Sequence, residues 1–132
     1  MAGTFKFELV TPERMALSED VAQVVVPGVE GEFTVLPGHA PVISALRPGV
    51  IEVALPDASK TRIFVKGGFA EVDAGHLTVL AERALAVEEM DAVVVAAELE
   101  AAEAELAAAG DDASRLAAAF AVDRLRALAR AS

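Results

Sequence analysis

The sequence has 132 residues, of which 55% are hydrophobic, and a formal net charge of −10. This length fits one domain with a small appendage, and this hydrophobic content excludes a disordered chain. The negative charge disfavours nucleic acid and anionic lipid as direct partners, so any association with a membrane is expected to run through a protein. The absence of cysteine excludes disulfides, thiolate metal sites and cysteine nucleophiles. We expect no targeting segment and no membrane-spanning helix.

Residues 1–86 are rich in valine, glycine and proline, and they predict an antiparallel β-sandwich. Residues 5–9 alternate apolar and polar side chains, which is the period of a half-buried strand. Turn sequences then recur about every 8–12 residues and separate further candidate strands. These candidate strands cover residues 21–26, 32–36, 42–46, 50–55, 61–66, 69–72 and 76–80.

Glycine and proline mark the turns of this first domain. Pro-Gly dipeptides stand at residues 27–28, 37–38 and 48–49. Each predicts a type II turn, because proline fixes the first central φ and glycine accepts the positive φ that follows. Gly67 and Gly68 fit no phosphate-binding loop, and two glycines between strands indicate a bulge or a close backbone contact.

Residues 87–132 are dominated by alanine, leucine, glutamate and arginine and predict a two-helix hairpin. The first helix is expected to run from Asp91 to Ala109, and Gly110 ends it. Asp111 and Asp112 then supply the N-cap of a second helix that runs to about residue 130. The loop is short, so the helices are expected to be antiparallel. The predicted fold is therefore α+β, with domains at residues 1–86 and 87–132.

Each predicted helix carries one apolar stripe and one type of charge. The stripes consist of Val95, Leu99, Ala102 and Leu106 on the first helix, and of Ala117, Ala121, Leu125 and Leu128 on the second. The first helix is acidic and the second is basic, so residues 124–130 are expected to lie near Glu88, Glu89 and Asp91. Alanines bury little area, and we therefore expect a weakly stable hairpin that docks on the sandwich or on a partner.

Candidate catalytic groups do not form a constellation in this sequence. His39 and His76 lack a third ligand and a His-x-His spacing, so a structural or interface role is preferred to metal binding. Glu30 and Glu32 flank Gly31, and paired carboxylates perform acid–base chemistry only where burial separates their pKa values. A solvated loop or an interface contact suits these glutamates better. The residues therefore predict a binding or structural protein rather than an enzyme.

Several blocks of sequence together resemble one protein family. Residues 29–41 read Val-Glu-Gly-Glu-Phe-Thr-Val-Leu-Pro-Gly-His-Ala-Pro and resemble the Glu-Gly-Glu…Pro-Gly-His-Ala-Pro signature of the epsilon subunit of bacterial F-type ATP synthase. The blocks at residues 7–13, 46–51, 67–72 and 77–82 are also similar to that family. The resemblance extends over the whole chain and is looser in the hairpin.

The resemblance implies a non-catalytic rotor subunit of the central stalk, without a cofactor, that couples proton-driven rotation to ATP synthesis. Its implied partners are the gamma subunit, the ring of c subunits and the catalytic alpha/beta head. Glu30, Gly31, Glu32 and His39 are the implied contacts with the ring or with gamma. The implied location is peripheral, on the cytoplasmic face of the bacterial inner membrane, and the isolated chain is expected to be a monomer.

A nucleotide-sensing subunit that inhibits ATP hydrolysis through its hairpin is the alternative function. Some relatives bind ATP through an Ile/Leu-Asp-x-x-Arg-Ala motif on the first helix. Here residues 90–95 read Met-Asp-Ala-Val-Val-Val, so Asp91 is kept but Val94 stands where the arginine belongs. Arg126 and Arg130 lie four residues apart and remain, with Asp91, candidates for weak nucleotide contacts. Two further alternatives are an all-β binding module that dimerises through its hairpin and a small β-sandwich enzyme.

Overall fold

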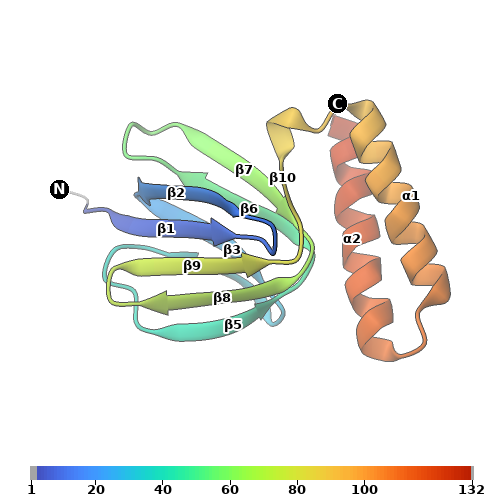
Figure 1. The fold of residues 1–132 in the computed structure, drawn as a ribbon, viewed down its shortest axis with the longest axis horizontal. Helices are drawn as coiled ribbons and strands as arrows, with labels where there is room; N and C mark the ends of the chain where they lie inside the picture. Colours follow the sequence, from blue (N-terminus) through green and yellow to red (C-terminus); the bar gives the residue numbers. More distant parts are fainter. Residues whose placement is uncertain (1–2, 132) are drawn as a thin grey trace.

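The computed structural model describes residues 3–131, which form ten strands followed by a short 3₁₀ helix and two α-helices (Figure 1). The strands are β1 (Phe5–Val10), β2 (Met15–Val21), β3 (Gln23–Gly28), β4 (Gly31–Val35), β5 (Val42–Leu46), β6 (Gly49–Ala54), β7 (Lys60–Val65), β8 (Gly68–Asp73), β9 (His76–Ala81) and β10 (Ala84–Ala86). The helical part consists of η1 (Val87–Glu89), α1 (Ala92–Ala108) and α2 (Asp112–Ala131).

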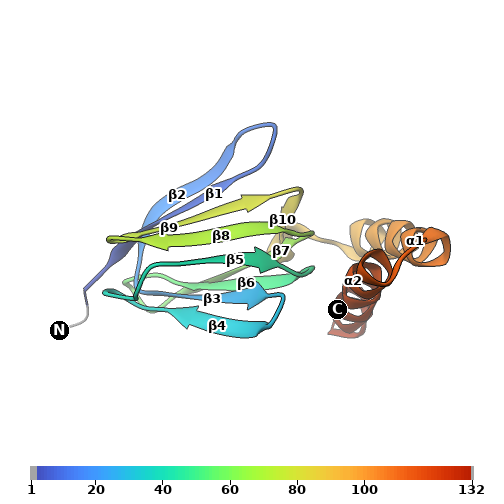
Figure 2. The same ribbon diagram turned by 90° about the horizontal axis from the view of Figure 1, so that it is seen from below.

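The strands form a sandwich, as the sequence predicts. Their order is β10-β7-β6-β3-β5-β8-β9-β1-β2, and β4 pairs with the other side of β3. β3 and β5 meet through one residue pair, Gly28 with Leu46, and here the sheet folds over into two layers (Figure 2). One layer holds β4, β3, β6, β7 and β10, and the other holds β5, β8, β9, β1 and β2. The pairing is antiparallel except between β1 and β9, which run parallel.

The sandwich core follows the alternation that the sequence shows. In β1, Phe5, Phe7 and Leu9 are buried, whereas Lys6 and Glu8 between them are partly exposed. Val24, Val53 and Val79 contribute other fully buried side chains from both layers. Close packing of these aliphatic and phenyl groups makes the sandwich a stiff body.

Two strands were not predicted from the sequence. β2 has the sequence Met-Ala-Leu-Ser-Glu-Asp-Val and lies at the edge of its layer, so only Val21 is buried and apolar alternation is weak. β10 has three residues, too few for a periodic pattern, and it pairs with β7 alone. Both strands are specified by their neighbours rather than by their own sequence.

Of the three Pro-Gly dipeptides, the described structure places only the second in a type II turn. Gly38 has a φ of +85°, and the backbone N–H of His39 donates to the carbonyl of Leu36 over 3.0 Å. The prediction is wrong for the other two, because Gly28 ends β3 and Gly49 begins β6. Their glycines serve close packing instead: a Cβ on Gly49 would lie 3.0 Å from the Cβ of Pro27.

The expected close backbone contact at the second glycine pair is confirmed. Gly68 has a φ of +122°, and a Cβ placed on it would lie 1.8 Å from the carbonyl oxygen of Leu80 on β9. No side chain fits there, because the oxygen belongs to the backbone of a paired strand.

Both predicted helices are present and antiparallel, and both are capped by aspartates. Asp91 accepts a hydrogen bond from the backbone N–H of Val94 over 2.9 Å, and Asp111 accepts one from Ser114 over 2.7 Å. The hydrogen bond from the Ser114 backbone lowers the pKa of Asp111 from its ordinary value of 3.8. These caps satisfy N–H groups that a helix start otherwise leaves without a partner.

The hairpin docks on the sandwich (Figure 1). Its buried side chains surround Phe64 of β7, which is fully buried and belongs to this second core rather than to the sandwich interior. The stripe predicted for α1 is confirmed, since Val95 and Ala102 are buried within it. The stripe predicted for α2 is confirmed at three of its four positions, since Ala121 and Leu125 are buried and Leu128 packs against them. The exception is Ala117, which is exposed, and Ala118 and Val122 are buried in addition.

Among the ion pairs of the described residues, none joins residues 124–130 to Glu88, Glu89 or Asp91, so the predicted charge pairing between the two helix ends is not found. Glu88 lies 3.8 Å from Arg62 of β7, and Arg126 donates to Glu103 over 3.0 Å. Glu88, Glu98 and Glu105 pair with basic side chains of the sandwich, which the sequence pattern of the helices alone does not reveal. Of the acidic residues of η1 and α1, Glu103 alone pairs with a basic residue of α2 among the ion pairs of the described residues.

Candidate interaction surface

An apolar row crosses the outer face of the layer formed by β5, β8, β9, β1 and β2. The register pairs Ala45 with Phe69, Phe69 with Leu80, Leu80 with Val10, and Val10 with Met15. Directly paired residues point to the same face of a regular sheet, so the first four side chains form one line across four strands. Met15 continues this line on β2, beyond a shift in register between Leu9 and Val10. Phe69, Leu80 and Met15 are 56%, 52% and 52% exposed, respectively. We call these five residues the apolar row.

Ile43 extends this surface along β5. It is 71% exposed, and its partner Glu71 lies two residues beyond Phe69 on β8. Large exposed apolar side chains that adjoin one another mark a contact surface more often than scattered single ones do. This surface was not identified from the sequence, because the residues come from five strands whose register only the fold establishes.

The Glu30–Gly31–Glu32 segment spans the end of the turn between β3 and β4 and the first two residues of β4. Gly28 pairs with Gly31, so Val29 and Glu30 are the two residues of a tight hairpin, and Gly31 has a φ of +133°. Among the described residues neither Glu30 nor Glu32 has an ion-pair partner, and both are exposed. The turn therefore presents two free carboxylates to the surroundings.

A shallow groove of about 350 Å³ joins this turn to β5. It is lined by Glu30, Gly31, Glu32, Phe33, Val42, Ile43 and Ser44. The groove thus connects the acidic turn with the end of the apolar surface at Ile43. Carboxylates and apolar side chains in one groove fit a protein surface that offers both basic and apolar groups.

His39 does not line this groove. It is half-buried, its Nδ1 lies 2.6 Å from the carbonyl oxygen of Ala40, and its ring lies 6.4 Å from that of Phe33. It also lines a small cavity at that end of the sandwich, to which His76 contributes as well. His39 therefore supports the loop that follows β4, and it approaches the groove only through Phe33.

Of the three candidate nucleotide contacts, Asp91 and Arg126 already have other partners. The Asp91 carboxylate caps α1, Arg126 is paired with Glu103 over 3.0 Å, and Arg130 is exposed in the last turn of α2. A phosphate would have to displace existing partners at two of these three residues. The arrangement offers no preformed cradle for a triphosphate.

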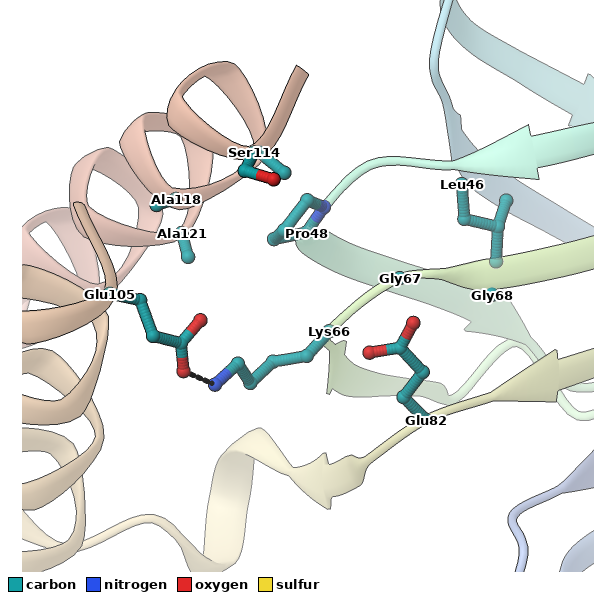
Figure 3. A pocket seen from close by; sticks show the side chains of 11 residues that line it. Leu46, Pro48, Lys66, Gly67, Gly68, Glu82, Glu105, Ser114, Ala118 and Ala121 are labelled. Atoms are coloured by element: carbon teal, nitrogen blue, oxygen red, sulfur yellow. Dashed lines mark hydrogen bonds and ion pairs between the residues drawn. The ribbon is translucent and has the colours of Figure 1, made fainter. Parts of the chain in front are cut away.

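A cavity of about 310 Å³ lies between the hairpin and the sandwich (Figure 3). Gly67 and Gly68 contribute backbone to its wall, and Glu82, Glu105 and Lys66 contribute charged side chains. Lys66 donates to Glu105 over 2.9 Å, so the one cation of this set is already neutralised. Two carboxylates in the wall disfavour a phosphate ligand.

Within residues 3–131, no group of three or more histidine, aspartate or glutamate side chains is arranged to hold a metal ion. The same residues include no helix long and apolar enough to cross a membrane. What the described surface does offer is an apolar row, an acidic turn and a groove between them, which are features of a protein–protein contact.

Comparison with known proteins identifies the family. The model of the ATP synthase delta/epsilon chain β-sandwich domain matches residues 4–87. The chain belongs to this family. A curated epsilon chain of ATP synthase from Maricaulis maris is 48% identical over 128 residues, which are 97% of this chain and 96% of that one. The epsilon chain of Parvibaculum lavamentivorans is 45% identical over 97% of both chains.

Solved structures support the same assignment. A chain in the mitochondrial ATP synthase of Euglena gracilis, solved as an OSCP/F1/c-ring assembly, is 30% identical with a TM-score of 0.74. The alignment covers 97% of this chain and 81% of that one. A chain from the central stalk/c-ring assembly of Tetrahymena thermophila, 13% identical with a TM-score of 0.67, shows the same fold. As an epsilon chain, the protein is a subunit of the ATP synthase central stalk and is not itself a catalyst.

Proposed function

We propose that the sandwich joins two rotating parts of the synthase, the gamma shaft and the ring of c subunits. The observation that carries this proposal is the apolar row across five strands, with Phe69, Leu80 and Met15 each about half exposed. An apolar surface of this kind is expected to be covered by a partner in the assembly, because removal of apolar side chains from water lowers the free energy. We assign it to gamma.

The acidic turn supplies the second contact, which we assign to the ring of c subunits. Glu30 lies in the two-residue turn and Glu32 lies just after it in β4, and both are free to pair with basic groups on the polar loops of the ring. Exposed charges of this kind determine orientation and register more than affinity. The groove between the turn and Ile43 places the two contact areas side by side, so one small body reaches both partners.

Torque transmission requires that this body does not deform. Each strand of the sandwich is hydrogen-bonded to at least one neighbour, and the two layers share a core of buried aliphatic and phenyl side chains. A close-packed interior resists shear, so rotation of the ring reaches gamma without slip. This mechanism needs no cofactor and no catalytic group on the chain.

The location of the chain in the cell follows from these contacts. The chain is peripheral, on the cytoplasmic face of a bacterial inner membrane, below the catalytic alpha/beta head. Its net charge of −10 repels anionic lipid, so the membrane is reached only through the ring. Without gamma the isolated chain is a monomer.

Nothing in the structure favours the nucleotide-sensing alternative. Asp91 and Arg126 already have partners, and Val94 replaces the arginine of the motif. We expect weak or no ATP binding to the isolated chain. Isothermal titration that yields a micromolar dissociation constant would contradict this expectation.

The proposal is tested by a charge placed in the apolar row. In a Phe69→Glu variant expressed with the other subunits, recovery of gamma with the tagged chain should fall at least about tenfold, as expected for a central contact. Proton-driven ATP synthesis by the membranes should fall in parallel. Val93→Glu is the matched control, because Val93 is 76% exposed on the outer side of α1. Undiminished recovery of gamma with Phe69→Glu would refute this docking surface.

The ring contact is tested separately by Glu32→Lys. This variant should still recover gamma, because the turn lies outside the apolar row, but coupled ATP synthesis should fall. Equal ATP synthesis by Glu32→Lys and unsubstituted membranes would exclude the turn from the ring contact.

A further inference from the structure

The outer face that carries the apolar row has a second row of paired residues beside it. The register pairs Ile43 with Glu71, Glu71 with Thr78, Thr78 with Glu8, and Glu8 with Ser18. The first four of these residues each lie two positions along a strand from a member of the apolar row, which is about 7 Å at the rise of a strand. We call Glu71, Thr78 and Glu8 the acidic row.

Both carboxylates of the acidic row face outward without a partner in the chain. Glu71 is exposed and Glu8 is partly exposed, whereas the residues on either side of each along its strand are buried. Among the ion pairs of residues 3–131, none involves Glu8 or Glu71. The two strands that carry them are two strand spacings apart, about 10 Å, and the residue between them is the neutral Thr78.

The strand charges on the opposite outer face are paired within the chain. On β6 and β7, Glu52 lies 3.2 Å from Lys60, and Arg62 lies 3.8 Å from Glu88. Each charged residue that faces outward from these two central strands therefore has an oppositely charged neighbour. The acidic row, by contrast, contains two carboxylates and no cation.

The acidic row flanks the apolar row on one side only. On the other side, β5, β8, β9 and β1 each end within one residue of their member of the apolar row. Two positions further from the apolar row than Glu8, Lys6 lies opposite Asp20, so this cation already has a carboxylate near it. The free negative charge of these strands is thus placed asymmetrically beside the apolar row.

This asymmetry limits the surface that can cover the face. A partner that covers the apolar row also approaches the acidic row, because only about 7 Å separates the two. A carboxylate that loses water without gaining a partner costs free energy. The matching surface is therefore apolar along one line and basic on one side of that line. If the same surface were rotated by half a turn, its basic groups would lie beyond the strand ends and both carboxylates would stay unpaired.

We propose that Glu8 and Glu71 pair with basic groups of gamma and fix the orientation of gamma on the apolar row. This pairing rests on the proposed function, in which gamma covers the apolar row. The apolar row supplies affinity, whereas the acidic row attracts gamma during association and selects one of two orientations that the apolar row alone would accept.

The rate of association tests the electrostatic contact. The full chain is bound to F1 particles from which this chain has been removed, at about 50 mM and at about 500 mM salt, where the Debye lengths are about 14 Å and about 4 Å. Glu8→Gln with Glu71→Gln should lower the association rate constant about tenfold at the lower salt and by less than about twofold at the higher salt. Equal rate constants for this double variant and the unsubstituted chain at the lower salt would refute the contact.

A matched control removes the same charge elsewhere. Glu52→Gln with Glu100→Gln takes one carboxylate from the opposite outer face and one from an exposed position of α1, and it should leave the association rate constant unchanged. If this control slows association as much as the acidic-row variant does, net charge alone accounts for the effect and the contact is refuted.

Phe69→Glu in the same assay separates this inference from the proposed function. If Phe69→Glu binds as tightly as the unsubstituted chain, the assignment of the apolar row to gamma is wrong, and the acidic-row contact is refuted with it. If Phe69→Glu loses binding while the Glu8→Gln, Glu71→Gln chain associates normally, only the acidic-row contact is refuted.

Cross-linking tests the orientation. The sequence contains no cysteine, so Ser18→Cys places a single photoreactive label at the β2 end of the acidic row, at an exposed position. Mass spectrometry of the cross-linked gamma should identify one segment of gamma when both carboxylates are present. The Glu8→Gln, Glu71→Gln chain should label a second, distant segment in addition. One and the same segment for both chains would refute the orienting role.

Discussion

The sandwich and the hairpin are stabilised in different ways. The sandwich buries phenyl and large aliphatic side chains from both layers, and its strands are tied together by backbone hydrogen bonds. The hairpin buries smaller side chains around Phe64 and adds ion pairs to the sandwich. A joint that transmits torque benefits from the first kind of packing. The second kind joins two parts that share no backbone strand pairing.

Replacement of one buried phenylalanine by alanine in each core should distinguish the sandwich core from the hairpin core. The larger loss of stability is expected in the sandwich. Phe7 is fully buried between the layers, and Phe7→Ala should cost about 3–5 kcal/mol of the free energy of unfolding. The hairpin loses its docking face with the sandwich. Strand and helix signals in urea denaturation should therefore shift together to lower urea, and separate transitions would contradict this.

Phe64→Ala should act on docking instead. Phe64 is equally buried, but it contacts the hairpin rather than the sandwich interior. We expect a loss of about 1–3 kcal/mol, confined to the docking of the hairpin. Hydrogen exchange should speed up in the hairpin and remain slow in β1 and β9.

Phe69→Ala is the matched control for Phe64→Ala, because Phe69 lies in the apolar row, is 56% exposed and does not belong to the hairpin core. In the isolated chain, Phe69→Ala should change hydrogen exchange neither in the hairpin nor in β1 and β9. If Phe64→Ala speeds exchange in β1 as much as in α1, the two parts form one cooperative unit and the comparison fails.

Overpacking at Ala102 tests how closely α1 approaches the sandwich and α2. Ala102 is fully buried in the second core, and Ala102→Leu should weaken docking by about 1–3 kcal/mol, because added methylene groups in a packed core force their neighbours to shift. Ala101→Leu adds the same volume at an exposed position and should be neutral. Limited proteolysis in the linker after Ala86 would show the difference, and equal cleavage of the two variants would contradict it.

The sequence predicts the sandwich better than the surface that it presents. Alternation in residues 5–9 and turn residues at regular intervals reflect local physics, so most strands could be located from sequence alone. β2 and β10 could not, because edge pairing with β1 and β7 defines them. The apolar row depends on register across five strands, and register is a property of the whole sheet.

The charge pattern of the hairpin is visible in the sequence, but it reveals only some of the partners. Acidic residues on α1 and basic residues on α2 predict pairing between the helices, and Arg126 does pair with Glu103. The fold brings Lys66 and Arg83 to α1 from segments that precede it by many residues, and Glu98 and Glu105 pair with them. Helical periodicity identifies the face of a helix, whereas its partner depends on tertiary packing.

The smallest effect is expected at the start of α2. The backbone N–H of Ser114 donates to Asp111 and lowers the pKa of that carboxyl below 3.8. Because the folded pKa lies below the unfolded value, the cap contributes stability above the unfolded pKa, and this contribution is lost as the pH falls through the folded pKa. Asp111→Asn keeps a capping side chain that does not titrate. The difference in thermal unfolding midpoint between Asp111→Asn and the unsubstituted chain should therefore change between neutral pH and a pH below 3.8, in the direction that costs the unsubstituted chain stability.

Asp123→Asn is the control for this change in charge, because Asp123 is exposed in the body of α2, where no helix-start N–H needs a cap. If both variants show the same pH dependence, the effect reflects net charge, and the hydrogen bond from Ser114 contributes nothing measurable. If only Asp111→Asn differs, the start of α2 is an acid-labile point in the hairpin. Acid would then loosen the hairpin at the end remote from its link to the sandwich, while the aliphatic core of the sandwich, which contains no titratable side chain among its buried residues, would be spared.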